Sequence, residues 1–377
     1  MRRGACILLL LLSPALYCQD TTYAREVIRF LTSEKCFGRG YVKNGLNIAA
    51  NYIIDQLRKE QVEPLFNGEY RQYFTHSVNT FPGLCRLRVN GRKLRPGYDF
   101  IPFPGSKSCS GKFQLVRSDS ARFTAKKHGT LVTVGVQNKL TFSVGAGQEN
   151  CGVNILSSSL DSEPAQMKLK IRSKVVKQFK SANIGCMMRG QTDTMLVFSA
   201  HYDHLGGIGE TWFPGANDNA SGVSMLLNLV KYFRLHPSRY TLVFIFFAGE
   251  EAGLLGSKYF CESNVLHLKK IKFLINLDLL GTGDDGIMVV NGAVFEKAFQ
   301  LLDRINSEQD LVKEIRKRGK AANSDHYWFT EAGVPSFFIY TLGGIKAYHD
   351  VYDIEKTLPL TDYLDVMRLI TAFASGI

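Results

Sequence analysis

The chain has 377 residues, of which 45% are hydrophobic and 21% are charged, and its formal net charge is +12. This composition excludes a disordered or fibrous protein and is typical of a globular one. The length allows two or three domains, or one large domain with an insertion. No motif of the known DNA- or RNA-binding modules is present, so we expect no nucleic-acid partner despite the positive charge.

The first 18 residues are typical of an export signal. Two arginines precede an apolar stretch of about ten residues, which is too short for a membrane span of roughly 20. We therefore expect cleavage near Cys18, no membrane span, and an exported protein that is periplasmic, surface-associated or extracellular. Lipidation of Cys18 is the less favoured alternative, because Leu16 and Tyr17 are bulky where a lipoprotein signal has small residues.

Six cysteines follow the expected export signal, and an even number is consistent with disulfide formation in an exported protein. They are Cys36, Cys85, Cys109, Cys151, Cys186 and Cys261. Their pairing cannot be deduced from spacing. Since none of them forms a CxxC pair, we do not expect a thiolate metal site.

Two segments precede the expected catalytic core. Residues 19–80 contain AREVIRFL and NGLNIAANYIIDQLRKEQV, whose apolar residues recur at helical spacing, so we expect an N-terminal helical part. Residues 81–175 contain short alternating runs, including RLRVNGRKL with its Asn-Gly hairpin signal. They predict a β-rich insert.

Residues 176–377 alternate between strand and helix patterns. Apolar runs such as TMLVFSA, TLVFIFFA and IKFLINL are separated by helical patterns such as SGVSMLLNLVKYF. This alternation predicts an α/β fold with a mainly parallel or mixed, doubly wound sheet and helices on both faces. We expect this part to be the catalytic core.

Residues that can bind metal follow three of these runs. TMLVFSA leads into His201, TLVFIFFA leads to Glu250 and Glu251, and IKFLINL leads into Asp278. Sites in doubly wound sheets form beyond the carboxyl ends of the strands, so these side chains should meet at one edge. Loops in the same part supply Asp218, in PGANDNASG, and His349, in YHDVYD.

Nitrogen and oxygen donors of this kind are the ligands that zinc takes when no cysteine is offered. Five ligands exceed the need of one catalytic zinc, which keeps a position open for water, so two zinc ions that share a carboxylate fit the number better. Such cations would also neutralise the adjacent carboxylates of Glu250 and Glu251. One of these glutamates would then be a ligand and the other a base.

Six ordered motifs resemble those of the M28 family of co-catalytic zinc aminopeptidases, of the bacterial exported type. They are HYDHLG, GANDNASG, FAGEEAGLLGS, NLDLLG, SDHYWF and YHD, between about Thr194 and the C-terminus. FGRG, over residues 37–40, also resembles the usual beginning of the family's domain. The resemblance implies a zinc exopeptidase fold and peptide substrates.

The resemblance also implies individual roles. It places Asp218 between two zinc ions, with Glu251 and His349 on one and His201 and Asp278 on the other. Glu250 would be the general base, and Asp203 would be the carboxylate that orients the imidazole of His201. Asp325, His326 and Tyr340 are candidates for the pocket, and the residue that stabilises the oxyanion is not assigned. The sequence does not say whether His204, which is close to the site along the chain, takes part.

We expect a zinc-dependent exopeptidase that removes N-terminal residues. The alternatives are a glutaminyl cyclase with one zinc ion, a carboxypeptidase of the same fold and a binding module that has lost its metal. Tyr348 stands where the cyclases typically have tryptophan, which argues against the first. We expect the insert to cap the pocket and limit substrate length; the oligomeric state is not indicated.

Overall fold

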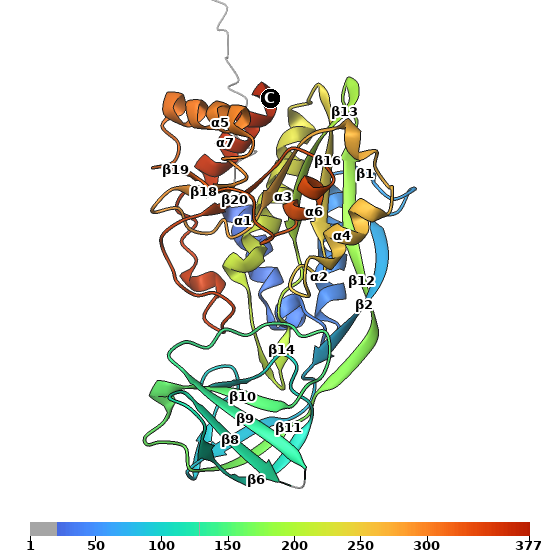
Figure 1. Ribbon diagram of the computed structural model, residues 1–377. Helices are drawn as coiled ribbons and strands as arrows, with labels where there is room; N and C mark the ends of the chain where they lie inside the picture. Colours follow the sequence, from blue (N-terminus) through green and yellow to red (C-terminus); the bar gives the residue numbers. More distant parts are fainter. Residues whose placement is uncertain (1–20, 128) are drawn as a thin grey trace, which may run out of the picture.

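The computed structural model describes residues 21–127 and 129–377, so the expected signal peptide and Cys18 lie outside the described residues. Figure 1 shows two parts, a large mixed sheet with helices and a smaller, β-rich part below it. The α-helices are α1 (Thr21–Leu31), α2 (Gly45–Lys59), α3 (Gly222–Leu235), α4 (Leu255–Glu262), α5 (Glu296–Gln309), α6 (His326–Glu331) and α7 (Tyr363–Gly376). Short helical turns are η1 (Glu34–Arg39), η2 (Ser157–Ser159), η3 (Ala216–Ser221), η4 (Leu268–Lys270) and η5 (Glu355–Thr357).

Within the described residues, the large sheet has nine strands in the order β1-β12-β16-β13-β17-β20-β18-β19, with β2 also paired to β12. The strands are β1 (Glu63–Pro64), β2 (Arg71–Thr80), β12 (Lys174–Met188), β13 (Thr192–His201), β16 (Tyr240–Phe247), β17 (Ile271–Leu277), β18 (Ile287–Val290), β19 (Ile315–Lys317) and β20 (Ser336–Thr341). The central strands β16, β13, β17 and β20 are parallel, whereas β12 and β18 run antiparallel to their neighbours in this group. The expected mixed sheet is therefore confirmed.

Helices cover both faces of this sheet. Along β16, Phe244 and Phe246 belong to a core shared with α1, α2, α3, α5 and α7, whereas Val243 and Ile245 belong to a second core shared with α4 and α6. All eight residues of β16 are buried, because each face of the strand packs against helices. Burial on both faces explains why the apolar run TLVFIFFA is continuous and does not alternate with polar residues.

The N-terminal part is helical only as far as Lys59, so the expectation of a helical segment over residues 19–80 is wrong at its end. Residues 71–80 form β2, which pairs with the long strand β12 over both sides of a register shift. The aromatic and β-branched residues of RQYFTHSVNT suit a strand. The strand depends on a partner about a hundred residues further along the chain, and local periodicity does not reveal that partner.

The β-rich part is built from two sheets around its own core, which lies between residues 81 and 171 and extends to Leu205, Ile208, Phe213 and Val351. One sheet has the order β5-β10-β9-β8-β7 and the other β4-β3-β11-β6. Its strands are β3 (Cys85–Val89), β4 (Arg92–Leu94), β5 (Phe100–Pro102), β6 (Cys109–Gln114), β7 (Val116–Arg117), β8 (Arg122–Lys127), β9 (Thr130–Gln137), β10 (Cys151–Leu156) and β11 (Gln166–Ile171). A small antiparallel ladder of β14 (Gly207–Ile208) and β15 (Thr211–Trp212) follows β13 in the chain.

The Asn-Gly hairpin predicted in RLRVNGRKL is present. Asn90 and Gly91 join β3 to β4 with φ angles of 48° and 88°, the left-handed conformations that a two-residue hairpin turn of this kind requires. Glycine adopts this conformation without a steric cost, and asparagine tolerates it better than most residues.

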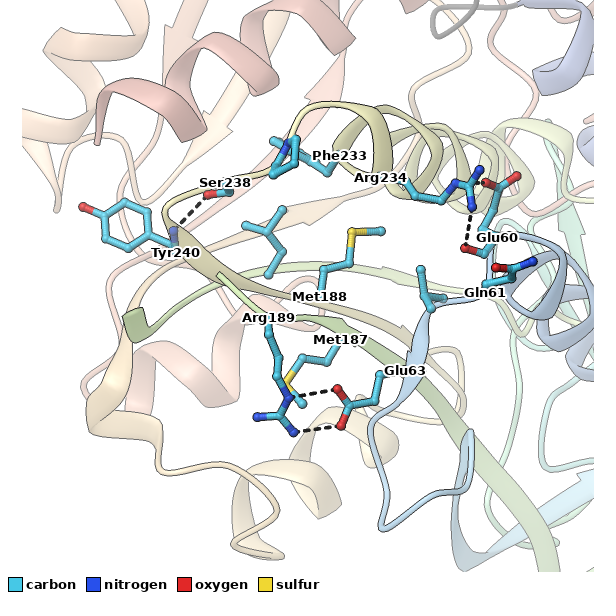
Figure 2. A pocket seen from close by; sticks show the side chains of 13 residues that line it. Glu60, Gln61, Glu63, Met187, Met188, Arg189, Phe233, Arg234, Ser238 and Tyr240 are labelled. Atoms are coloured by element: carbon cyan, nitrogen blue, oxygen red, sulfur yellow. Dashed lines mark hydrogen bonds and ion pairs between the residues drawn. The ribbon is translucent and has the colours of Figure 1, made fainter. Parts of the chain in front are cut away.

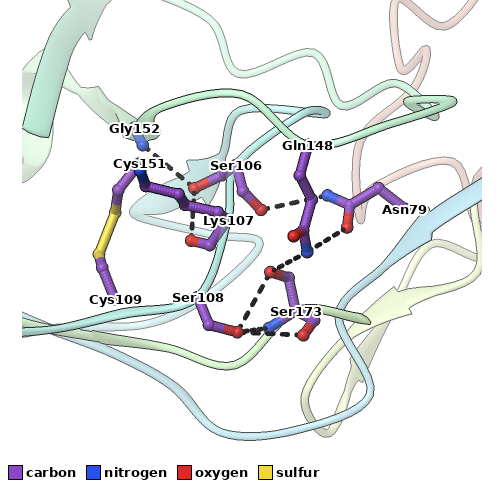
Figure 3. The surroundings of a disulfide bond; sticks show 9 residues. All are labelled: Asn79, Ser106, Lys107, Ser108, Cys109, Gln148, Cys151, Gly152 and Ser173. Carbon is purple, nitrogen blue, oxygen red and sulfur yellow. Dashed lines mark hydrogen bonds between the residues drawn. A yellow bond between two sulfur atoms is a disulfide. The ribbon is translucent and has the colours of Figure 1, made fainter. Parts of the chain in front are cut away.

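A disulfide joins the two sheets of the β-rich part. It links Cys109, at the start of β6, to Cys151, at the start of β10 (Figure 3). The backbone N–H of Gly152 donates a hydrogen bond to Ser106 Oγ beside it. Cys36, Cys85, Cys186 and Cys261 keep free thiols.

Candidate metal centre

Three parallel strands deliver the predicted ligands to one edge of the large sheet. β13 ends at His201, β16 ends three residues before Glu250, and β17 ends one residue before Asp278. Asp218 comes from η3 and His349 from the loop that follows β20. All five predicted ligands and Glu250 line one cavity of about 210 Å³, together with Leu279, Asn323, Phe338, Tyr340 and Tyr348.

The carboxylate of Asp218 lies between two histidines. Its Oδ1 is 3.4 Å from Nε2 of His201, and its Oδ2 is 3.1 Å from Nε2 of His349. Each histidine also has a carboxylate of its own. His201 Nε2 is 3.3 Å from Asp278 Oδ2, and His349 Nε2 is 3.3 Å from Glu251 Oε2.

These distances fit two metal ions. Two ligand atoms that each lie about 2.0 to 2.2 Å from one tetrahedral ion are separated by roughly 3.3 to 3.6 Å. The two groups of donors share Asp218, one of whose oxygens faces each histidine. Asp278 Oδ1 is buried and has no hydrogen-bond partner, as expected of a group whose partner is a cation.

The other ring nitrogen of each histidine is occupied, which leaves Nε2 free as a ligand. Nδ1 of His201 lies 3.2 Å from the main-chain oxygen of Asp203, and Nδ1 of His349 lies 3.0 Å from that of Phe142. A carbonyl oxygen only accepts hydrogen bonds, so Nδ1 must carry the proton in both rings. Backbone carbonyls commonly orient metal-binding histidines in this way.

The cluster holds more carboxylates than its two histidines can neutralise. Burial raises the pKa of Glu250 well above its ordinary value, and the adjacent charge of Glu251 raises it further. Burial also raises the pKa of Glu251 to about 8, with an added contribution from Asp218. A divalent cation would stabilise the ionised forms of these carboxylates, so the donor set suits a cation.

The carboxylate of Asp203, which we expect to orient the imidazole of His201, makes its hydrogen bonds to other groups. Its Oδ1 is 3.8 Å from His201 Nδ1, which is too long for a hydrogen bond. The carboxylate instead accepts hydrogen bonds from the hydroxyl of Tyr41 (2.8 Å) and from the backbone N–H groups of Glu250 (3.2 Å) and Glu251 (3.4 Å). Asp203 therefore holds the turn that carries both glutamates, and its own main-chain oxygen orients His201.

His204 is part of the site. It is fully buried, and its Nδ1 lies 2.7 Å from Glu251 Oε1. The other oxygen of this carboxylate faces His349, so His204 is placed to fix the orientation of Glu251.

The loop that carries Asp218 is held from both sides. The buried guanidinium of Arg39 donates hydrogen bonds to five main-chain oxygens, those of Leu31, Tyr202, Pro214, Gly215 and Asp218. The carboxylate of Asp353 accepts hydrogen bonds from the backbone N–H groups of Asn217 (2.8 Å) and Asp218 (3.0 Å). This explains why the FGRG segment, far from the ligands in sequence, belongs to the site.

Of the three predicted pocket residues, only Tyr340 lines the cavity, whereas Asp325 and His326 do not. Tyr340 lines the cavity, and its hydroxyl accepts a hydrogen bond from Arg318 (3.2 Å). Asp325 and His326 are buried and do not line the cavity. Their neighbour Ser324 is closer to the ligands, because its hydroxyl donates to Asp278 Oδ2 at 3.2 Å.

A second hollow, of about 430 Å³, lies at the opposite end of β16, near Tyr240 (Figure 2). Its walls carry Glu63 paired with Arg189 and Glu60 paired with Arg234. The charged side chains of these pairs already have partners, so this hollow does not offer the reactive groups that the cavity with Glu250 offers.

Residues 183–374 match the model of peptidase family M28. The chain belongs to this family. Among curated relatives, the aminopeptidase YwaD of Bacillus subtilis is 31% identical over 156 residues, which cover 38% of this chain and 31% of that protein. A probable leucine aminopeptidase of Arthroderma otae is 30% identical over 214 residues, or 53% of this chain and 59% of the relative. The chain thus spans between about a third and three fifths of the length of these two relatives.

Solved structures share the fold over nearly the whole M28 chain. The zinc aminopeptidase BSAP from Bacillus subtilis superposes with a TM-score of 0.69 at 20% identity and covers 95% of each chain. A peptidase M28 precursor from Shewanella amazonensis has a TM-score of 0.69 at 14% identity, covering 95% of this chain and 93% of its own. At these identities the superpositions show the α/β fold alone.

Proposed function

We propose that the protein is a metal-dependent aminopeptidase that binds two zinc ions and hydrolyses N-terminal peptide bonds. The single observation that carries the proposal is the position of Asp218, whose two oxygens face two separate pairs of histidine and carboxylate. His201 and Asp278 would hold one ion, and Glu251 and His349 the other. The names of the relatives, which include zinc and leucine aminopeptidases, support both the metal and the reaction.

Glu250 is the candidate general base. It lines the cavity beside the ligands, and its backbone N–H is fixed by Asp203. When bound, the two ions would polarise the scissile carbonyl and make a water molecule more acidic. The carboxylate of Glu250 would then accept the proton of that water and pass it to the leaving amine. Glu251 is engaged by His204 and His349, so it is positioned to be a ligand and Glu250 is the free carboxylate.

The test is the variant Glu250→Gln, which keeps the shape of the side chain and removes its basicity. We expect hydrolysis of a leucine-terminated peptide to fall by at least about a thousandfold, within the range by which proton transfer and positioning contribute to catalysis. The zinc content, measured by elemental analysis, should stay at two ions per chain. Glu308→Gln, on the exposed side of α5, is the matched control and should keep full activity. Activity in the Glu250 variant would contradict the role of the base.

A mixed peptide library identifies the reaction. Zinc-loaded protein should shorten peptides from the N-terminus, which mass spectrometry detects as loss of the first residue. Loss of C-terminal residues would identify a carboxypeptidase, and formation of pyroglutamate without release of an amino acid would identify a cyclase. One zinc ion per chain at saturation would likewise contradict the proposed pair.

We also propose that residues 1–18 direct export and that residues 81–175 are an insert in the catalytic fold. The hydrophobic core of the β-rich part, most of whose residues lie between 81 and 171, supports the insert. A relative from Mycobacterium tuberculosis, 26% identical over 283 residues, is named a probable lipoprotein aminopeptidase, which supports export. No helix in residues 21–127 or 129–377 is long and apolar enough to cross a bilayer.

A further inference from the structure

The positive charge of the chain is concentrated in the insert. Residues 81–175 contain 16 lysines and arginines but only 5 aspartates and glutamates, whereas the rest of the chain contains 30 and 29. The insert therefore carries +11 of the formal net charge of +12. Such a one-sided distribution creates a local positive potential that the total alone does not reveal.

Six of these sixteen cations lie together on the outer face of the sheet β4-β3-β11-β6. Successive residues of a strand point to opposite faces, and here the alternate residues Leu87, Phe113 and Leu169 are buried in the core of the insert. The residues between them point outward. They form the basic face, which we define as Arg86, Arg88, Lys93, Lys112, Lys168 and Lys170.

The strand register places four cations of the basic face in one row across four strands. Arg88 is opposite Lys93 on one side and Lys168 on the other, and Lys168 is also opposite Lys112. In the next row, Arg86 is opposite Lys170, which is opposite Ser110. With strands 4.7 to 4.9 Å apart, the first row spans roughly 14 Å. Like charges directly opposite each other destabilise a sheet, so this arrangement has a cost in the protein alone.

Carboxylates do not offset that cost. Among the described residues, none of the six cations of the basic face forms an ion pair, and the hollow of about 700 Å³ that they line contains no aspartate or glutamate. Three of the five acidic residues of the insert pair with arginines elsewhere, in Arg92–Asp161, Arg95–Asp99 and Arg117–Glu163. The basic face is therefore complementary to a ligand with several negative charges.

The lining of the hollow narrows the class of ligand. It contains no aromatic ring, which single-stranded nucleic acids need for stacking, and its only apolar side chains, Leu87 and Leu169, are buried. Peptide side chains would find no apolar pocket there. A hollow of this volume fits a short stretch of one extended chain better than the broad plane of a bilayer. Lysine and arginine bind sulfate groups through charge-assisted hydrogen bonds, and Ser110 adds a hydroxyl for a sugar.

We propose that the basic face is a binding site for a linear sulfated polysaccharide, whose repeated sulfates lie along the row of four cations. Figure 1 shows β6 and β11 in the β-rich part, below the large sheet that carries the metal ligands. In the described part of the chain, the basic face and the cavity with Glu250 share no lining residue, so a ligand on one does not occupy the other. The protein would thus be held on a sulfated polymer while its catalytic part acts on peptides.

The test uses the full chain and dextran sulfate, with uncharged dextran as the blank. Binding should be measured by fluorescence anisotropy over a range of salt concentrations. In the variant Arg88→Gln/Lys112→Gln/Lys168→Gln we expect the Kd to rise at least tenfold and its salt dependence to become shallower, because fewer counterions are released. The melting temperature of this variant should not fall, since the substitutions remove like-charge repulsion. Peptide hydrolysis should be unchanged.

The matched control is Lys35→Gln/Lys59→Gln/Lys297→Gln, which removes three exposed charges outside the insert. It should keep the parent Kd. The proposal is overturned if the control loses as much affinity as the first variant, because binding would then reflect net charge alone. It is also overturned if the first variant binds like the parent, or if a thymidine oligonucleotide, poly-glutamate or phosphatidylserine vesicles bind the parent more tightly than dextran sulfate.

Discussion

Arg39 shows how much a single residue outside the ligand set contributes to the site. Its guanidinium is fully buried and donates to five main-chain oxygens, including that of Asp218. Arginine suits this place because its five N–H donors form a rigid fork. Loss of the fork would leave several buried carbonyls without a donor, and each such group costs about 1 to 3 kcal/mol.

We therefore expect Arg39→Met to lower the free energy of unfolding by about 3 kcal/mol or more, measured by urea denaturation of the zinc-loaded protein. Arg39→Lys keeps the charge but not the fork and should recover only a small part of the loss. Arg29→Met, on an exposed side chain of α1, is the control and should change stability by less than about 0.5 kcal/mol. A stable Arg39→Met variant would show that the loop with Asp218 does not depend on these hydrogen bonds.

His204 contacts Glu251, a predicted metal ligand, so its removal tests whether such a contact affects the affinity for zinc. Removal of a residue that hydrogen-bonds a metal ligand typically weakens metal affinity by 10- to 100-fold. We expect His204→Ala to raise the Kd of zinc by about that factor, measured by competition with a chromogenic chelator. His267→Ala, at an exposed histidine, should leave the Kd unchanged. An unchanged Kd in the His204 variant would mean that this ring only fills space.

The sequence predicts that His201, Glu250 and Asp278 lie together, and in the structure they line one cavity. Each lies at the end of an apolar run or just after it, and parallel strands bring these ends to one edge of the sheet. The supporting residues have no such pattern. Arg39 and Tyr41 reach contacts 162 or more residues away, and Asp353 caps Asn217 from 136 residues along the chain. Such contacts exist only once the sheet has formed, so no local pattern in the sequence predicts them.

At the scale of elements, the disulfide clamps the two sheets of the insert, because Cys109 belongs to β6 and Cys151 to β10. The two residues are 42 apart in sequence. A cross-link that closes a loop of this length limits the unfolded chain and stabilises the folded one by about 4 kcal/mol in the entropic treatment. Six cysteines can pair in fifteen ways, and their spacing does not single out this pairing, since it depends on how the two sheets stack.

We expect Cys109→Ala/Cys151→Ala to expose the insert to local unfolding, seen as faster hydrogen exchange of amides in β6 and β10. Amides in β13 and β16 should keep their protection, because these strands belong to a different core. A reducing agent should reproduce the effect in the parent and change nothing in the variant. Equal acceleration in both parts would show instead that the insert and the large sheet unfold as one unit.

For the molecule as a whole, the insert contacts the candidate metal centre through Phe142, although none of its described residues lines the cavity with Glu250. The main-chain oxygen of Phe142, within the insert, accepts the hydrogen bond of His349 Nδ1, and the ring of Phe142 stacks on Phe213 of the catalytic part at 4.8 Å. Deletion of the whole insert would therefore disturb His349, a predicted metal ligand, whatever its effect on substrate length. A test of the expected limit on substrate length must keep the segment around Phe142.

The metal centre also links the stability of the whole molecule to its cofactor. Glu250, Glu251 and Asp278 line one cavity, and burial together with nearby carboxylates raises the pKa of each, so their ionised forms oppose folding unless cations are present. An ion that binds only the folded state stabilises it by about 2.7 kcal/mol at a free concentration of 100 Kd. Chelation should therefore lower the melting temperature by several degrees.

Differential scanning calorimetry with a chelator, followed by titration with zinc, measures this link. The melting temperature should recover in proportion to the logarithm of free zinc. In Asp218→Asn the shared ligand is weakened, so the response to zinc should shrink strongly, while Asp303→Asn, at an exposed position on α5, should respond like the parent. Because His201 and His349 hold the ionised carboxylate of Asp218 and keep its pKa below the ordinary value, the zinc-free form of Asp218→Asn should melt below the zinc-free parent. If the melting temperature of the parent does not change with zinc, the fold tolerates these buried carboxylates without a cation.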